Sequence, residues 1–191
     1  MAPVTIAPYS HEIYHAVTKS SLHEALDASH TLSAMEAMST VIRNCFLKHK
    51  VQNNFTACIN HRHFDLHPSE QNIEEHNGRA MASTNFESIV PCSWLFHEGK
   101  LYPYEYRRVE RGEVESDPEL PQVFIDDLGS IVAEKGISPV IRIQFYKPGI
   151  VGMESTNQTT RTSTLKSYTE GSEEAIEATR RNSVIASFAS F

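Results

Sequence analysis

The order of apolar patterns along this chain constrains its fold most. Between residues 34 and 49, apolar side chains recur every three or four positions, which is the period of one helix face: Met35, Met38, Ile42, Cys45 and Phe46. Residues 21–29 begin with Ser21 and Glu24 in the spacing of a capping box, so they are also expected to be helical. The chain therefore opens with helices, and the segments after residue 50 follow other patterns.

Strand patterns dominate the chain after residue 50. In these segments the apolar residues either run together or alternate with polar ones. The predicted strands are residues 55–67, the hairpin arms 94–96 and 101–106, residues 140–146 and the Thr- and Ser-rich residues 150–168. For 150–168, a disordered segment is the alternative to a closing hairpin. Between these strands, a helix is predicted to begin at Ser116-Asp117-Pro118 and to end at Gly136.

Helices that precede a mixture of strands predict an α+β fold rather than regular βαβ winding. We expect a single domain in which two or three helices pack a mixed or antiparallel sheet. The domain is predicted to span residues 20–170. Residues 1–19 are expected to form an N-terminal arm over it, and residues 171–191 a tail or a short helix.

Composition narrows the class of protein. With 191 residues, 40% of them hydrophobic, the chain can bury a core, and its formal charge of −7 argues against general binding to nucleic acid or anionic membranes. Its three cysteines have no repeated spacing, it has no run of 18 apolar residues, and residues 1–19 do not match a secretory signal. We therefore expect a cytoplasmic protein that binds neither nucleic acid nor membranes. A small-molecule substrate is expected from the segment 61–67, and the sequence leaves the oligomeric state open.

The segment His61-Arg62-His63-Phe64-Asp65-Leu66-His67 carries most of the chemistry, because it holds three of the ten histidines in seven positions. If strand 55–67 continues through it, successive side chains alternate between two faces. One face would then carry His61, His63, Asp65 and His67. The other face would carry Arg62, Phe64 and Leu66. Apolar residues earlier in the strand would provide the floor of a ligand pocket.

Metal binding is one chemistry that fits this row. Imidazole and carboxylate groups are ligands for Zn²⁺, Fe²⁺ or Mn²⁺, and two histidines two positions apart on a strand can reach one ion. His61, His63 and Asp65 are therefore predicted to hold a divalent metal. His67 or His97 would provide a fourth ligand.

Acid–base catalysis without a metal is the second chemistry, because histidine titrates near neutral pH. The residues predicted to take part are His61, Arg62, His63, Asp65 and Tyr104. Arg62 or Tyr104 would hold an anionic or carbonyl group of the substrate. Glu105 is a further candidate if its hairpin arm faces the histidines. Reactions of the lyase, isomerase, cyclase or oxygenase type all agree with such a set.

A structural role is the alternative to both chemistries. His61 and His63 would then hydrogen-bond to the backbone or to Asp65, in a protein that binds ligands or partners without catalysis. Asp65 would pair with Arg62 or cap the turn at Pro68. Clustered histidines could also make an assembly respond to pH near 6.

The run HRHFDL at residues 61–66, Pro91-x-x-Trp94 and the hairpin Gly99–Glu105 resemble a group of small filamentous-fungal proteins. The resemblance covers about residues 40–160. It implies no particular activity. Small fungal proteins of this kind often belong to secondary-metabolite pathways, so the resemblance favours a small-molecule enzyme.

Overall fold

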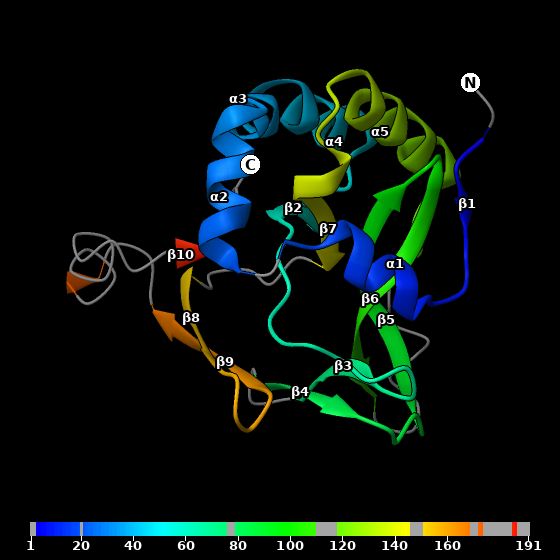
Figure 1. Cartoon of the computed structure of the whole chain (residues 1–191). Helices are drawn as coiled ribbons and strands as arrows, with labels where there is room; N and C mark the ends of the chain where they lie inside the picture. The colour runs from blue at the N-terminus through cyan, green and yellow to red at the C-terminus, as the bar shows by residue number, and fades with distance from the viewer. Residues whose placement is uncertain are drawn as a thin grey trace.

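The structure is a computed structural model that describes residues 3–19, 21–75, 79–109, 118–145, 151–168, 172–173 and 185–186. After a two-residue strand at residues 5–6, helices come first along the chain, and the rest of a curled mixed sheet follows, with one further long helix between its strands (Figure 1). The α+β architecture predicted from the order of apolar patterns is therefore confirmed. Within the described residues, no helix is both long and apolar enough to cross a lipid bilayer.

The helices of the described residues are α1 (His11–Val17), α2 (Leu22–Thr31), α3 (Ala34–Ala37), the π-helical turn η1 (Met38–Ile42), α4 (Arg43–His49), α5 (Gln122–Glu134) and the 3₁₀ turn η3 (Ser138–Val140). The helix predicted over residues 34–49 is confirmed as α3, η1 and α4 in continuous succession. The helix predicted over 21–29 is confirmed as α2. Its cap is formed as expected, because the Ser21 hydroxyl accepts a hydrogen bond from the backbone N–H of Glu24 at 3.2 Å.

Helix α5 confirms the helix predicted between the strands, but with a different start. It ends just before Gly136, whose φ of 64° suits a residue without a side chain. It begins at Gln122 rather than at Pro118. Pro121 explains the later start, because proline lacks an amide hydrogen and disfavours helical backbone at the residue before it.

The strands are β1 (Thr5–Ile6), β2 (Phe55–Ile59), β3 (Gln71–Glu74), β4 (Arg79–Ser83), β5 (Ile89–His97), β6 (Lys100–Arg108), β7 (Ile141–Phe145), β8 (Val151–Asn157), β9 (Thr162–Tyr168) and β10 (Ile185–Ala186). They are ordered β10-β8-β9-β4-β3-β6-β5-β7-β2 across the sheet, and β1 pairs with β6. The pairs β3–β6 and β1–β6 are parallel and the other pairs are antiparallel, so the sheet is mixed.

Three local predictions of strands are confirmed. The hairpin arms at 94–96 and 101–106 lie within β5 and β6, which are joined by a tight turn at Glu98 and Gly99. The alternating segment 140–146 contains β7. The Thr- and Ser-rich segment 150–168 forms the hairpin β8–β9.

The single strand predicted over residues 55–67 is wrong beyond Ile59. The Asn60 side-chain amide donates to the backbone carbonyls of Val17 and Pro139, each at 3.2 Å, and the chain leaves the sheet at this point. Residues 60–70 then form an irregular connecting segment between β2 and β3. The partners of Asn60 lie far away in the sequence, so no local pattern could reveal this break.

The two ends of the chain are described to different extents. The predicted arm over residues 1–19 contains β1 and α1, and Tyr14 of α1 is buried. Of residues 171–191, only 172–173 and β10 are described, so the predicted tail or short helix lies largely outside the described residues.

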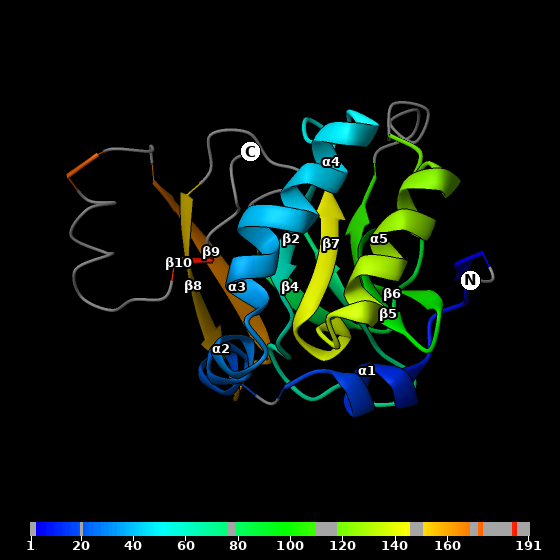
Figure 2. The same cartoon turned by 90° about the horizontal axis from the view of Figure 1, so that it is seen from above.

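The sheet has two different faces. Helices α3, α4 and α5 lie along one side of it (Figure 2), and the main hydrophobic core fills the space between them and this outer face. The opposite, inner face contacts α1 and the connecting segment, through a smaller cluster: Tyr14, Phe64, Leu66, Leu95 and Tyr104. Strand β5 shows the alternation directly, because Trp94 and Phe96 belong to the outer core and Leu95 to the inner cluster.

Candidate active site on the inner face

The connecting segment of residues 60–70 is held over the inner face by contacts from three distant elements. Tyr14 of α1 donates a hydrogen bond to the carbonyl of Phe64 at 3.1 Å. Gln158, in the turn between β8 and β9, donates to the carbonyl of His63 at 2.8 Å. The Tyr104 hydroxyl on β6 donates to the carbonyl of His61. These bonds fix the positions from which the side chains of the segment project.

His61 and His63 both project into the interior, where their side chains are buried. Their rings meet edge to face with centroids 4.7 Å apart. Nε2 of His63 lies 2.7 Å from Oε1 of Glu105 on β6. The structure therefore joins His61 and His63 with Glu105, the carboxylate that sequence analysis named as a further candidate.

Glu105 is the centre of a buried hydrogen-bonded group. Its Oε1 also accepts a hydrogen bond from the Asn72 side-chain amide at 3.0 Å, and its Oε2 accepts one from Arg142 Nη1 at 2.5 Å. The Arg142 guanidinium lies over the Tyr104 ring, with its central carbon 5.0 Å from the ring centroid. We call this group the Glu105 cluster; its members are His63, Asn72, Tyr104, Glu105 and Arg142.

A β-bulge places two consecutive residues of β6 on the inner face. Ser93 of β5 pairs with Glu105, whereas Trp94 pairs with Pro103, so the register shifts by one residue at Tyr104. Tyr104 and Glu105 can therefore both contact Arg142. Simple alternation would have sent one of them to the outer face.

The Glu105 carboxylate orients the His63 ring through the contact at Nε2. The Glu105 carboxylate and the Arg142 guanidinium are 12% and 8% exposed, and they neutralise each other. A further charge within this buried group would need compensation of its own. A neutral ring that donates from Nε2 to Glu105 carries its lone pair on Nδ1. His63 is thus oriented by a carboxylate in the manner of a general base.

Other residues predicted for the site lie elsewhere. The Asp65 side chain is 79% exposed; its Oδ1 lies 3.1 Å from Arg62 Nε and 3.9 Å from His15 Nδ1. His67 is exposed. His97 lies at the β5–β6 turn, 3.9 Å from the carboxylate of Glu98.

The predicted shared face of His61, His63, Asp65 and His67 is wrong, because the strand that would create it ends at Ile59. The structure joins His61 with His63 but brings neither Asp65 nor His67 to them. Within the described part of the chain, no three His, Cys, Asp or Glu side chains are arranged to hold one metal ion.

Arg62 turns toward α1 and takes part in a second group of histidines. Its Nη1 lies 2.8 Å from Nδ1 of His15, while Nε2 of His15 and of His11 lie 3.1 and 2.8 Å from the carbonyl of Leu66. Partial burial lowers the pKa of His15, and the neighbouring guanidinium of Arg62 lowers it further. This group attaches α1 to the connecting segment and lies apart from Glu105.

No local sequence pattern indicated Arg142 or Asn72 as a residue of the site. Arg142 and Gln144 alternate with apolar residues along β7, a pattern typical of a strand with one solvent-exposed face. In the structure this polar face points into the interior instead, and Arg142 is buried. The arginine itself could have been a signal. In a strand that is covered on both faces, an arginine is buried only when it has a charged or polar partner, so Arg142 would have indicated a buried acidic group.

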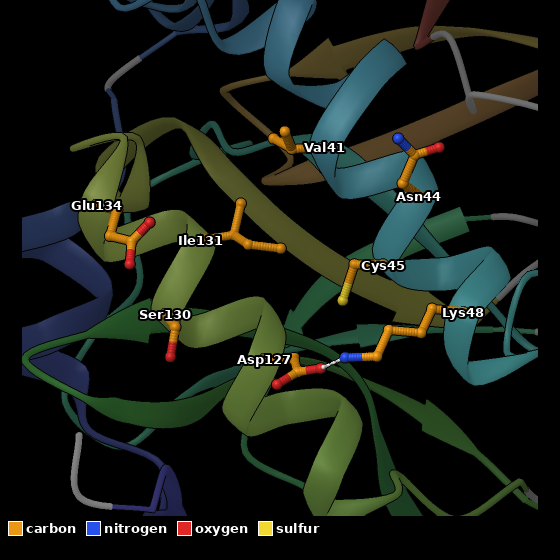
Figure 3. A pocket seen from close by; sticks show the side chains of 8 residues that line it. All are labelled: Val41, Asn44, Cys45, Lys48, Asp127, Ser130, Ile131 and Glu134. Carbon is orange, nitrogen blue, oxygen red and sulfur yellow. Dashed lines mark hydrogen bonds and ion pairs between the residues drawn. The ribbon is translucent and has the colours of Figure 1, made fainter.

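A separate groove of about 430 Å³ lies among the helices, between η1–α4 and α5 (Figure 3). Lys48 spans it to reach Asp127 at 2.5 Å, and His49 contacts the same carboxylate oxygen at 2.8 Å. Cys45 lines the groove, but burial raises the pKa of its thiol to about 11, so it stays protonated at neutral pH and is a poor nucleophile. The groove therefore offers less chemistry than the Glu105 cluster.

Comparison of the chain with protein-family models, with curated proteins and with solved structures found no match. The geometry of the inner face is therefore the basis on which a function can be assigned.

Proposed function

We propose that this protein is an acid–base enzyme that acts on a small molecule at the Glu105 cluster. The observation that carries the proposal is the buried chain from His63 through Glu105 to Arg142, with contacts of 2.7 and 2.5 Å. Buried pairs of oriented titratable groups are concentrated at functional sites.

Energetics support a functional role for this chain. Removing two charges from water costs several kcal/mol per ion. Proteins in which well-packed apolar residues replace a buried ion pair are often as stable as the original protein, or more stable. Next to an apolar cluster that contains Phe64 and Leu95, an apolar substitute would fit the surroundings. Chemistry or binding is a reason to retain the charged groups.

Proton transfer is the reaction that best suits His63. Nδ1 would take a proton from a carbon next to a carbonyl group: the C–H bond breaks, an N–H bond forms, and the electron pair moves to the carbonyl oxygen. Glu105 would orient the ring and stabilise the imidazolium through Nε2. Return of the proton to another carbon gives an isomerase, and loss of a leaving group gives a lyase. Both belong to the reaction types expected from the sequence.

The predicted metal ligands Asp65, His67 and His97 lie apart from His61 and His63. The proposal therefore rests on proton transfer rather than on a bound divalent metal.

Hydrogen–deuterium exchange tests this proposal without knowledge of the natural substrate. Proton NMR in D₂O would follow the loss of carbon-bound hydrogen from neutral hydroxyketones such as dihydroxyacetone. We expect the protein to accelerate the exchange and His63→Gln to slow it by about 100-fold or more. Asp65→Asn is the matched control, because it removes an exposed carboxylate of the same segment, and it should leave the rate unchanged. No acceleration, or equal rates for wild type and His63→Gln, would refute the proposal.

A ligand-binding protein without catalysis is the second candidate. The observation in its favour is that both oxygens of Glu105 and the hydroxyl of Tyr104 already have hydrogen-bond partners within the protein. Such a group can form a rigid wall of a ligand-binding site without taking part in proton transfer. This candidate predicts that neutral ligands bind the wild-type protein and exchange no hydrogen.

A further inference from the structure

Polar residues form a continuous row across the inner face of five adjacent strands. Asn72 of β3 pairs with Glu105 of β6, which pairs with Ser93 of β5. Ser93 also pairs with Gln144 of β7, and Gln144 pairs with Thr56 of β2. We call these five residues the polar row. It extends the Glu105 cluster along the sheet, in the direction away from β3.

The side chains of the row point inward, as their neighbours demonstrate. Phe55 and Ala57, on either side of Thr56, belong to the outer core, and so does Trp94, which follows Ser93. Asn72 contacts Glu105 directly. Thr56, Ser93 and Asn72 are 1%, 0% and 0% exposed.

Three atoms of the row are buried without a hydrogen-bond partner among the described residues: Thr56 Oγ1, Ser93 Oγ and Asn72 Oδ1. Buried polar groups in folded proteins are bonded with few exceptions, and each exception needs an explanation. Three of these exceptions fall in one row, beside a buried ionic pair, whereas others, such as Gln52 Oε1 and Gln71 Oε1, lie outside the row.

We propose that the polar row binds an uncharged molecule bearing hydroxyl or amide groups, and so determines the substrate class of the same site. This inference rests on the proposed function. Asn72 Oδ1 accepts hydrogen bonds, and the two hydroxyls can donate or accept them. A polyol or a hydroxylated carbonyl compound offers both kinds of group.

Charge argues for a neutral molecule. The positive charge of Arg142 is already compensated by Glu105 at 2.5 Å, and the other members of the row are uncharged. An anion would compete with Glu105 for Arg142 and lie near its carboxylate. A cation would lie near the guanidinium. Each would bring an uncompensated charge into a buried site, which is costly.

Spacing sets the size of the molecule. Adjacent strands lie about 4.8 Å apart, so the two strand intervals from Ser93 to Thr56 span roughly 10 Å. An extended five-carbon polyol, with a hydroxyl at each end, reaches across most of this span. Because Ser93 pairs with Glu105, the His63 end of this span is the end at which proton transfer would occur.

Thermal unfolding of apolar variants tests the row in the absence of any ligand. Ser93→Ala and Thr56→Val remove hydroxyls that lack a partner, so each should raise the Tm, by roughly 2–4 °C. Thr162→Val is the matched control: Thr162 is also buried in a strand, but its hydroxyl is 2.8 Å from that of Thr160, so this variant should lower the Tm. A fall in Tm for Ser93→Ala and Thr56→Val would show that these hydroxyls serve the fold, and would overturn the inference.

Binding of xylitol and of xylonate, which has the same carbon chain with a carboxylate, tests the ligand class. We expect xylitol to shift the backbone amide NMR signals of Thr56, Ser93 and Gln144, and xylonate to leave them unchanged. The Ser93→Ala/Thr56→Val double variant should bind xylitol about tenfold more weakly or worse. No shift with xylitol, or equal binding of xylonate, would overturn the inference.

The two proposals can fail separately. If the wild-type protein binds xylitol but exchanges no hydrogen of a neutral ketone, the acid–base proposal fails and the row remains a ligand site. If it exchanges hydrogen while Ser93→Ala/Thr56→Val changes neither binding nor Tm, the row is not the site of recognition.

Discussion

The two faces of the central strands carry different kinds of side chain. The outer face of β2, β5 and β7 presents Phe55, Trp94 and Ile143 to the helices in an apolar core. The inner face of these strands presents Thr56, Ser93 and Gln144 beside a buried ionic pair. The outer face gains stability from burial, whereas the inner face bears the cost of burying charged and polar groups.

The largest expected effect concerns the outer face. Phe124 of α5 is fully buried against Phe46, with ring centroids 4.9 Å apart, and against Phe55. Phe124→Ala should lower the free energy of unfolding by about 3–5 kcal/mol, because it leaves a cavity. Urea denaturation measures this loss. A loss under about 1 kcal/mol would mean that this face is not the main source of stability.

A change of similar size is expected at the inner face, but there it should be reversible by a second substitution. Glu105→Ala leaves Arg142 buried without its partner and should cost about 3–5 kcal/mol. The double variant Glu105→Leu/Arg142→Met replaces the ion pair by apolar side chains and should regain most of that loss. Urea denaturation of both variants provides the comparison. A double variant as unstable as Glu105→Ala would mean that the pair itself stabilises the fold.

A smaller effect is expected where the N-terminal arm touches α5. A Cβ atom on Gly129 would lie 2.6 Å from Cγ2 of Val4, so Gly129→Ala forces this contact apart. We expect a loss of about 1 kcal/mol, the net of overpacking and improved helix propensity. In a Val4→Ala background the same substitution should become stabilising. Thermal unfolding of the four proteins measures the change of sign, and equal effects in both backgrounds would place the arm elsewhere.

The smallest effect is a pH dependence at α1. The pKa of His15 is lowered in the folded protein by burial and by Arg62, with His11 nearby; Asp65 opposes the shift. The unfolded chain therefore binds the proton more readily, so His15 supports stability above its unfolded pKa of about 6.5. This support is lost as the pH falls from there toward the folded pKa.

Urea denaturation between about pH 7.5 and 5.5 measures this dependence. The wild-type protein should lose more stability over this range than His15→Gln does. Parallel pH profiles for the two proteins would contradict the assignment.

Local sequence patterns predicted most helices and strands, whereas contacts between distant residues determine which side chains meet at the candidate site. Residues 34–49 and strand β7 have clear periods of their own, so both could be predicted from sequence. The end of β2 depends on contacts of Asn60 with Val17 and Pro139, which no neighbouring residue encodes. Because the strand ends at Ile59, strand alternation wrongly predicted that Asp65 shares a face with His61 and His63.

The centre of the site was also partly hidden. His61 and His63 were identified from their spacing, and Glu105 from its place in the hairpin. Its contact with His63 requires the bulge at Tyr104, which reverses the facing expected from alternation. Arg142 lies in a pattern typical of a strand with one exposed face. The sequence does not reveal that the connecting segment covers this face, so Arg142 was not expected to be buried.

The state of the His63 ring tests the central claim most directly. Nitrogen-15 NMR of the histidine rings at neutral pH reports which nitrogen carries hydrogen. A neutral His63 with hydrogen on Nε2 and a lone pair on Nδ1 is the predicted result, and this signal should change in Glu105→Gln. A ring with hydrogen on both nitrogens, or on Nδ1 alone, would contradict a base oriented by Glu105.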